Sequence, residues 1–176
     1  MGLLFTFYVS ALLILGVVAM AIAAYAWRRR EMPGASPLSV LGVSTAIWLI
    51  GQSMELTSQT IPAVLWWVRF EFVGIVSLPS AWLWFAAEYT GSIPWLRHRR
   101  IWLLAIVPTI TMAVLLTNDY HSLFWKSITL RVEDFRIVID SQYGSWFWVH
   151  VAYSYTCLLT GAYVIMRSVL QTASLF

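Results

Sequence analysis

The chain has 176 residues, of which 60% are hydrophobic and only 11% are charged, and its formal net charge is +3. A soluble domain carries about 25% charged residues, so this composition excludes an ordinary water-soluble globule and indicates a protein whose surroundings are lipid. The basic residues stand in short clusters between apolar runs, which argues against nucleic acid as a partner.

Five apolar runs approach or exceed the roughly 20 residues that a helix needs to cross the hydrocarbon core of a bilayer. In chain order they cover residues 3–26, 38–56, 62–89, 101–117 and 146–166. The sequence therefore predicts an all-α membrane protein, a five-helix transmembrane bundle that forms a single domain over residues 1–176. Positive charge follows the first run, at Arg28, Arg29 and Arg30, so we expect an uncleaved helix rather than a signal peptide.

A polar segment, residues 118–145, separates the last two predicted spans. Apolar side chains alternate with other residues over residues 128–132 and again over 135–139, on either side of an acidic pair at 133–134. A period of two is typical of β-strands, and the acidic pair predicts the turn between them. We expect a short extracellular β-hairpin that packs on the helix ends, because an isolated hairpin is marginally stable in water.

The distribution of arginines predicts the orientation. If the N-terminus is outside, the inner loops and helix ends hold most of the basic residues, as the positive-inside rule requires. These residues are Arg28, Arg29, Arg30, Arg97, Arg99, Arg100 and Arg167. The prediction is a multi-pass protein of the cell inner membrane with its N-terminus outside.

Ionisable residues inside or bordering the spans are costly in lipid and tend to face the bundle interior. The second and third predicted spans are joined by a short turn, so Arg69 is expected to pair with Glu55 first and with Glu71 second. Two interpretations stay open, a buried ion pair that fixes the helix register and a polar pocket for a small-molecule ligand from the outer side. The hypothetical ligand-binding residues are Arg69, Glu71, Glu55, His150, Tyr153 and His121.

No catalytic constellation is recognisable in the sequence, which lacks a glycine-rich phosphate loop and the motifs H-E-x-x-H and G-x-S-x-G. The three histidines do not have the spacing of a zinc site. The single cysteine, Cys157, cannot form a disulfide within one chain. We therefore expect no enzyme activity, no cofactor and no metal.

Three stretches resemble one family. The segment LPSAWLWFAAEYTG, Leu78–Gly91, resembles the third helix of the N-terminal seven-transmembrane sensor region of bacterial histidine kinases. The segment LLTNDYHSLFW, Leu115–Trp125, is similar to that family's motif at the outer end of the fourth helix, and Tyr143–Ile165 resembles its fifth-helix entry. Positions that match the family pattern are Asn118, His121, Phe124, Trp125, Trp146 and Tyr153.

The resemblance implies a sensory input module that signals to a cytoplasmic kinase or other output domain, in cis or in trans, with a homodimer as a further option. The sequence departs from the family pattern because the sixth and seventh helices do not follow the fifth predicted span, so no kinase output is expected in this chain. The interpretations that stay open are a fragment, a truncated gene product and a stand-alone remnant that works through a partner. The alternative function is a small membrane transporter or channel subunit. A transporter should show inverted repeats, and none is recognisable in the sequence.

Overall fold

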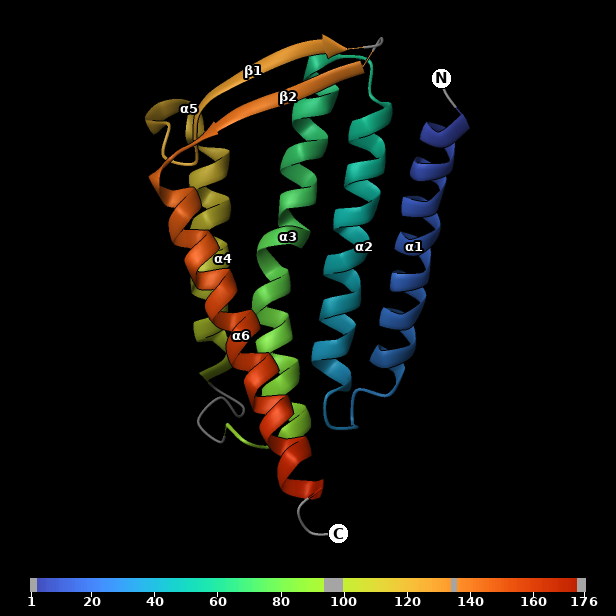
Figure 1. The fold of residues 1–176 in the computed structure, drawn as a ribbon, viewed down its shortest axis with the longest axis vertical. Coiled ribbons are helices and arrows are strands. Elements are labelled where there is room, and N and C mark those ends of the chain that lie inside the picture. The colour runs from blue at the N-terminus through green and yellow to red at the C-terminus, as the bar shows by residue number, and fades with distance from the viewer. Residues whose placement is uncertain (1–2, 94–99, 134–135, 174–176) are drawn as a thin grey trace.

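The structure is a computed structural model that describes residues 3–93, 100–133 and 136–173. Its long helices run side by side, and a two-stranded hairpin lies across one end of them (Figure 1). The N-terminus lies at this hairpin end and the C-terminus at the opposite end. The elements are α1 (Leu3–Arg28), α2 (Ala35–Thr57), α3 (Ile61–Thr90), η2 (Arg100–Trp102), α4 (Leu103–Leu116), α5 (Asn118–His121), β1 (Trp125–Glu133), β2 (Arg136–Tyr143) and α6 (Ser145–Ala173).

Four helices in the described part of the chain, α1, α2, α3 and α6, are long and apolar enough to cross a membrane. The fourth predicted span corresponds to the shorter apolar segment Arg100–Leu116, which combines η2 and α4. At 1.5 Å per residue this segment is about 26 Å long, slightly less than the roughly 30 Å hydrocarbon core. The predicted helical membrane bundle is confirmed.

Small residues let the first three helices approach closely, as is common between helices in membranes. A Cβ atom on Gly42 of α2 would lie 2.8 Å from the Ala19 carbonyl oxygen of α1. A Cβ atom on Gly74 of α3 would collide with the backbone of α2. The Ser39 hydroxyl of α2 also donates a hydrogen bond of 2.9 Å to the Ala23 carbonyl of α1.

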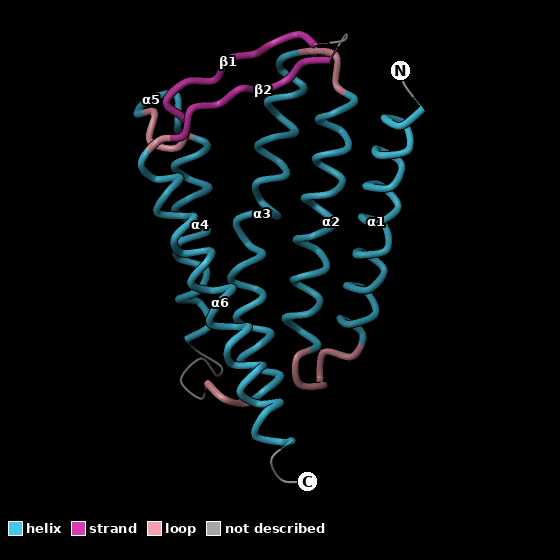
Figure 2. The backbone as a smooth tube through the Cα atoms, in the orientation of Figure 1, coloured by secondary structure: helices cyan, strands magenta, loops and turns pink. Residues whose placement is uncertain are grey.

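The predicted hairpin is also confirmed, since β1 and β2 form an antiparallel pair in which Leu130 faces Ile139 and Glu133 faces Arg136. The predicted turn begins at the end of β1, and its second acidic residue, Asp134, lies outside the described residues. Figure 2 shows both strands crossing the ends of the helices.

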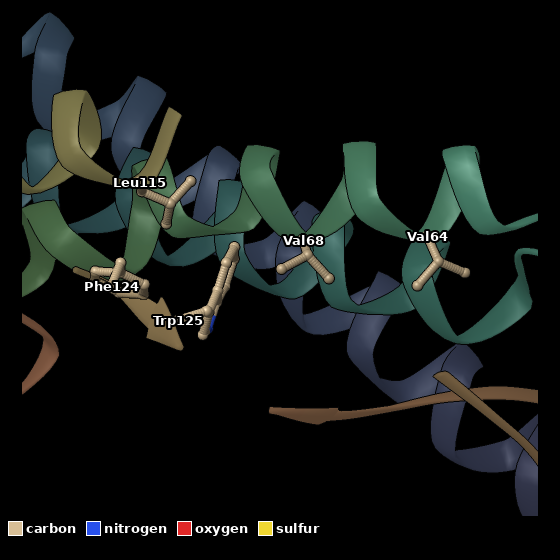
Figure 3. Packing of buried hydrophobic residues seen from close by; sticks show 5 residues of the cluster. All are labelled: Val64, Val68, Leu115, Phe124 and Trp125. Atoms are coloured by element: carbon tan, nitrogen blue, oxygen red, sulfur yellow. The ribbon is translucent and has the colours of Figure 1, made fainter. Parts of the chain in front are cut away.

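A buried apolar cluster anchors the hairpin on the bundle. It brings together residues from α3, the end of α4 and the start of the hairpin (Figure 3), and its members are Val64, Val68, Leu115, Phe124 and Trp125. The rings of Phe124 and Trp125 both contact Phe72 of α3 edge-on, with centroids 5.3 and 5.7 Å away. The first residues of the hairpin are therefore part of the core, and the turn that leads into them has a defined geometry.

Candidate functional site

Asn118 organises the turn between α4 and the hairpin. Its side-chain oxygen accepts hydrogen bonds from the backbone amides of Phe124, at 2.9 Å, and Trp125, at 3.0 Å. Its side-chain amide donates to the Trp125 carbonyl at 3.0 Å. Asn118 is buried, so these three bonds satisfy polar groups that water cannot readily reach. One side chain thereby determines where β1 begins.

His121 closes the same turn with both ring nitrogens. The Leu123 amide donates to Nδ1 at 3.1 Å, so that nitrogen carries no hydrogen. Nε2 therefore carries the proton of the neutral ring and donates to the Thr117 hydroxyl, 3.0 Å away. The Thr117 hydroxyl donates in turn to the Ala113 carbonyl at 2.7 Å. The hydrogen-bond network thus determines a single tautomer of His121.

The turn is bonded directly to the start of α6. The Leu123 carbonyl accepts a hydrogen bond of 2.9 Å from the Trp146 amide, and the Phe124 carbonyl accepts one of 2.7 Å from the Gly144 amide. A Cβ atom at Gly144 would overlap the Leu123 carbonyl oxygen, so this approach requires glycine. Residues 117–125 and 143–146 form a unit that we call the hairpin joint.

Arg69 forms an ion pair, but with a different partner from the predicted one. Its guanidinium lies 3.7 Å from the carboxylate of Asp119 on α5, and the two side chains are 40% and 80% exposed. The expected pairing with Glu55 or Glu71 is wrong. Glu71 packs against Gly51 of α2, and Arg69 lies about 200° further around the helix, so it cannot also face α2.

Glu71 is buried between α2 and α3, with only 6% of its surface exposed. Its Oε2 atom has no hydrogen-bond partner among the described residues. A Cβ atom on Gly51 would lie 2.6 Å from the Glu71 Cβ atom, which shows how closely the two backbones approach. Glu55, one turn further along α2, instead accepts a hydrogen bond of 3.1 Å from Gln52.

His150 lies in a second polar cluster, inside the bundle between α4 and α6. It is 5% exposed. Its Nδ1 atom is 3.3 Å from the Thr111 hydroxyl, and its Nε2 atom is 3.2 Å from the Ser154 hydroxyl. The Trp146 indole donates to the same Thr111 oxygen at 3.1 Å. Thr111 therefore connects α4 to two successive turns of α6.

Tyr153 compensates for a proline in α4. Its hydroxyl donates to the Leu104 carbonyl at 2.9 Å. Residue 108, which would normally donate to this carbonyl within the helix, is a proline and has no amide hydrogen. The only hydroxyl hydrogen of Tyr153 is used in this bond, so Ser80 of α3, 2.9 Å away, must be the donor in their contact. Tyr153 thus joins three helices.

The six residues proposed for one ligand pocket occupy three different places. Arg69 and His121 lie near the hairpin joint, Glu55 and Glu71 lie on the α2 and α3 helices, and His150 and Tyr153 lie on α6. Sequence reasoning missed their partners Asp119, Thr111 and Ser80. A proline four residues after Leu104 was an available signal, since it frees that carbonyl for a donor from another helix. Ligand binding by these residues stays a prediction.

The structure is that of an integral helical membrane protein. Its apolar helices have membrane-spanning length, and polar side chains inside the bundle join them by hydrogen bonds. Among known families, the model of the N-terminal 7TM region of histidine kinase matches residues 11–176, and the chain belongs to this family. No curated protein and no solved structure gave a match. The predicted resemblance is confirmed, and membership of the family supports a sensory input module in the inner membrane.

Proposed function

We propose that the chain is the input module of a two-component signalling protein, and that the hairpin joint receives the stimulus and α6 carries it across the membrane. One observation carries this proposal. Leu123 accepts a hydrogen bond from α6 through its carbonyl and donates one to His121 through its amide. A displacement of α5 or the hairpin therefore acts on the first turn of α6. The output is a kinase or related domain, in cis or in trans.

The distribution of charge supports an orientation with the hairpin outside the cell. Five exposed arginines lie near the end of the bundle opposite the hairpin, and cytoplasmic loops of membrane proteins are enriched in such residues. They are Arg28, Arg29, Arg30, Arg100 and Arg167. With this orientation the N-terminus is outside and the C-terminal end of α6 points to the cytoplasm.

Near the hairpin joint, a polar small molecule can reach two of the six predicted ligand-binding residues from outside, namely Arg69 in its exposed ion pair with Asp119, and His121. Glu71 and His150 are buried and support the bundle instead of contacting such a ligand. Breaking the exposed ion pair costs little, because charges in contact with water interact weakly. An anionic ligand can therefore compete with Asp119 for Arg69.

The signalling role is tested in the full-length protein with its natural output domain, reconstituted in vesicles. Gly144→Ala places a methyl group against the Leu123 carbonyl and is expected to change basal autophosphorylation of the output kinase. Tyr120→Ala is the control, because Tyr120 lies in the same hairpin joint but its side chain is 91% exposed and takes part in none of the hydrogen bonds described for the joint. Unchanged autophosphorylation in a folded Gly144→Ala protein would argue against the hairpin joint as the input.

The orientation is tested separately by labelling single cysteines in a Cys157→Ser background. Ser141→Cys on β2 should react with an impermeant maleimide added to intact cells. Ser36→Cys, near the opposite end of the bundle, should react only after the cells are permeabilised. The reverse pattern would show that the hairpin faces the cytoplasm.

A further inference from the structure

A groove of about 350 Å³ lies on the flank of the bundle, in the half opposite the hairpin. Small residues on facing helices leave this space open, among them Ser77 and Ala81 of α3 and Ala105 of α4. Trp84 and Trp102 also line it, and Trp102 is 75% exposed. The groove therefore opens at the protein surface, where a membrane-spanning helix meets lipid.

Two of the residues that line the groove have an unused polar group. The indole N–H of Trp84 and the hydroxyl of Thr109 have no hydrogen-bond partner among the described residues. The neighbouring Trp82 differs, because its indole donates to the Leu158 carbonyl at 3.1 Å. A polar group in the hydrocarbon region is costly without a partner. The Thr109 hydroxyl can turn to a carbonyl of its own preceding turn, so the Trp84 indole is the group that favours an occupant that is largely apolar and has a hydrogen-bonding oxygen atom.

A basic residue directly precedes the groove lining in the chain. Arg100 directly precedes the lining residues Ile101 and Trp102, is exposed, and forms no ion pair with another described residue. Arginine at a membrane interface attracts anionic head groups. The volume is at the lower end of the range for small-molecule sites, so it suits one hydrocarbon chain better than the two chains of a phospholipid.

We propose that the groove binds a single-chain fatty acid, with its chain between α3 and α4 and its carboxylate at Arg100. The ligand enters from the bilayer, so this site is distinct from the hairpin joint. Two lining residues, Leu104 and Ser80, are also hydrogen-bond partners of Tyr153. Occupancy is therefore coupled to α6, a consequence that rests on the proposed signalling function, whereas binding itself does not.

The test uses the whole chain in phosphatidylcholine vesicles with a diazirine derivative of palmitic acid as the probe. After illumination, labelled peptides are identified by mass spectrometry. Labelling is expected in residues 77–84 and 100–109, and an excess of unlabelled palmitic acid should abolish it. Ala105→Trp fills the groove and should prevent labelling. Ile106→Trp is the matched control, because Ile106 is exposed on the same helix and does not line the groove.

The carboxylate contact has its own test, in which palmitic acid and its methyl ester compete with the probe. Wild type should prefer the acid, and Arg100→Gln should weaken binding of the acid about fivefold while leaving the ester unchanged. Labelling that does not saturate, or that is equal in Ala105→Trp and Ile106→Trp, would mean ordinary lipid contact and overturn the proposal. An unchanged preference in Arg100→Gln would overturn the assignment of the carboxylate. All readouts measure binding, so their failure leaves the proposed signalling function intact.

Discussion

Removing the hydroxyl group of Tyr153 tests whether this side chain compensates for the proline in α4. In Tyr153→Phe the Leu104 carbonyl loses its donor, and Pro108 cannot supply one from within the helix. Ser80 also loses its acceptor. A serine in a helix can turn its hydroxyl to a carbonyl of its own preceding turn, so the loss at Ser80 is recoverable. The hydrogen bond lost at the Leu104 carbonyl has no such replacement.

The expected magnitude follows from this difference. Hydrogen bonds between helices in membrane proteins contribute about 0.6 kcal/mol on average and at most about 1.7 kcal/mol. A buried group left without a partner costs about 1–3 kcal/mol. The Leu104 carbonyl becomes a group without a partner in Tyr153→Phe, so this substitution should lower the free energy of unfolding by about 1–2 kcal/mol.

The assay is reversible unfolding by SDS in mixed micelles, carried out as a double-mutant cycle with Pro108→Ala. An alanine at position 108 has an amide hydrogen that can bond to the Leu104 carbonyl, so Tyr153→Phe should cost about 1 kcal/mol less in this background. Tyr155→Phe is the control, because Tyr155 is 63% exposed and has no hydrogen-bond partner among the described residues. An equal loss in both backgrounds would refute the reasoning.

Three further substitutions test the packing in the same unfolding assay. Asn118→Ala removes three hydrogen bonds and should cost about 2–4 kcal/mol, and a loss below about 1 kcal/mol would show that the turn holds without them. Gly51→Ala places a Cβ atom 2.6 Å from that of Glu71 and should lower the free energy of unfolding by about 1–3 kcal/mol. An unchanged free energy would show that α2 and α3 separate freely. Arg69→Gln should cost at most about 1 kcal/mol, because its pair with Asp119 is exposed, and a larger loss would contradict that description.

The helices and the hairpin could be predicted because each depends on a local pattern. A long apolar run must form a helix in lipid, where every backbone polar group needs an internal partner. The alternation over residues 128–139 predicts strands with equal directness. Neither inference required knowledge of how the helices pack, and the structure agrees with both.

The partners of the buried and ionisable groups could not be predicted in this way. The short turn after α2 shows that α2 and α3 are neighbours, but not which side of α3 faces α2. That side is determined by the close approach of Gly51 to Glu71 and of Gly74 to the α2 backbone. Once Glu71 faces α2, Arg69 points away from it. Its partner, Asp119, is far away in sequence and is brought near by the packing of α4 on α3.

The polar contacts of α6 explain how one helix can carry a displacement along its length. It is hydrogen-bonded to the hairpin joint at Trp146, to α4 through His150, and to α4 and α3 through Tyr153. Hydrogen bonds are directional, so α6 cannot slide by a full turn without breaking all of them at once. Further along, a Cβ atom on Gly161 would collide with the Trp82 indole of α3, which shows how closely α6 packs on α3 there. A displacement at the hairpin joint is therefore expected to move α6 as a unit by a small amount, with the Tyr153 contacts shifting together with the joint.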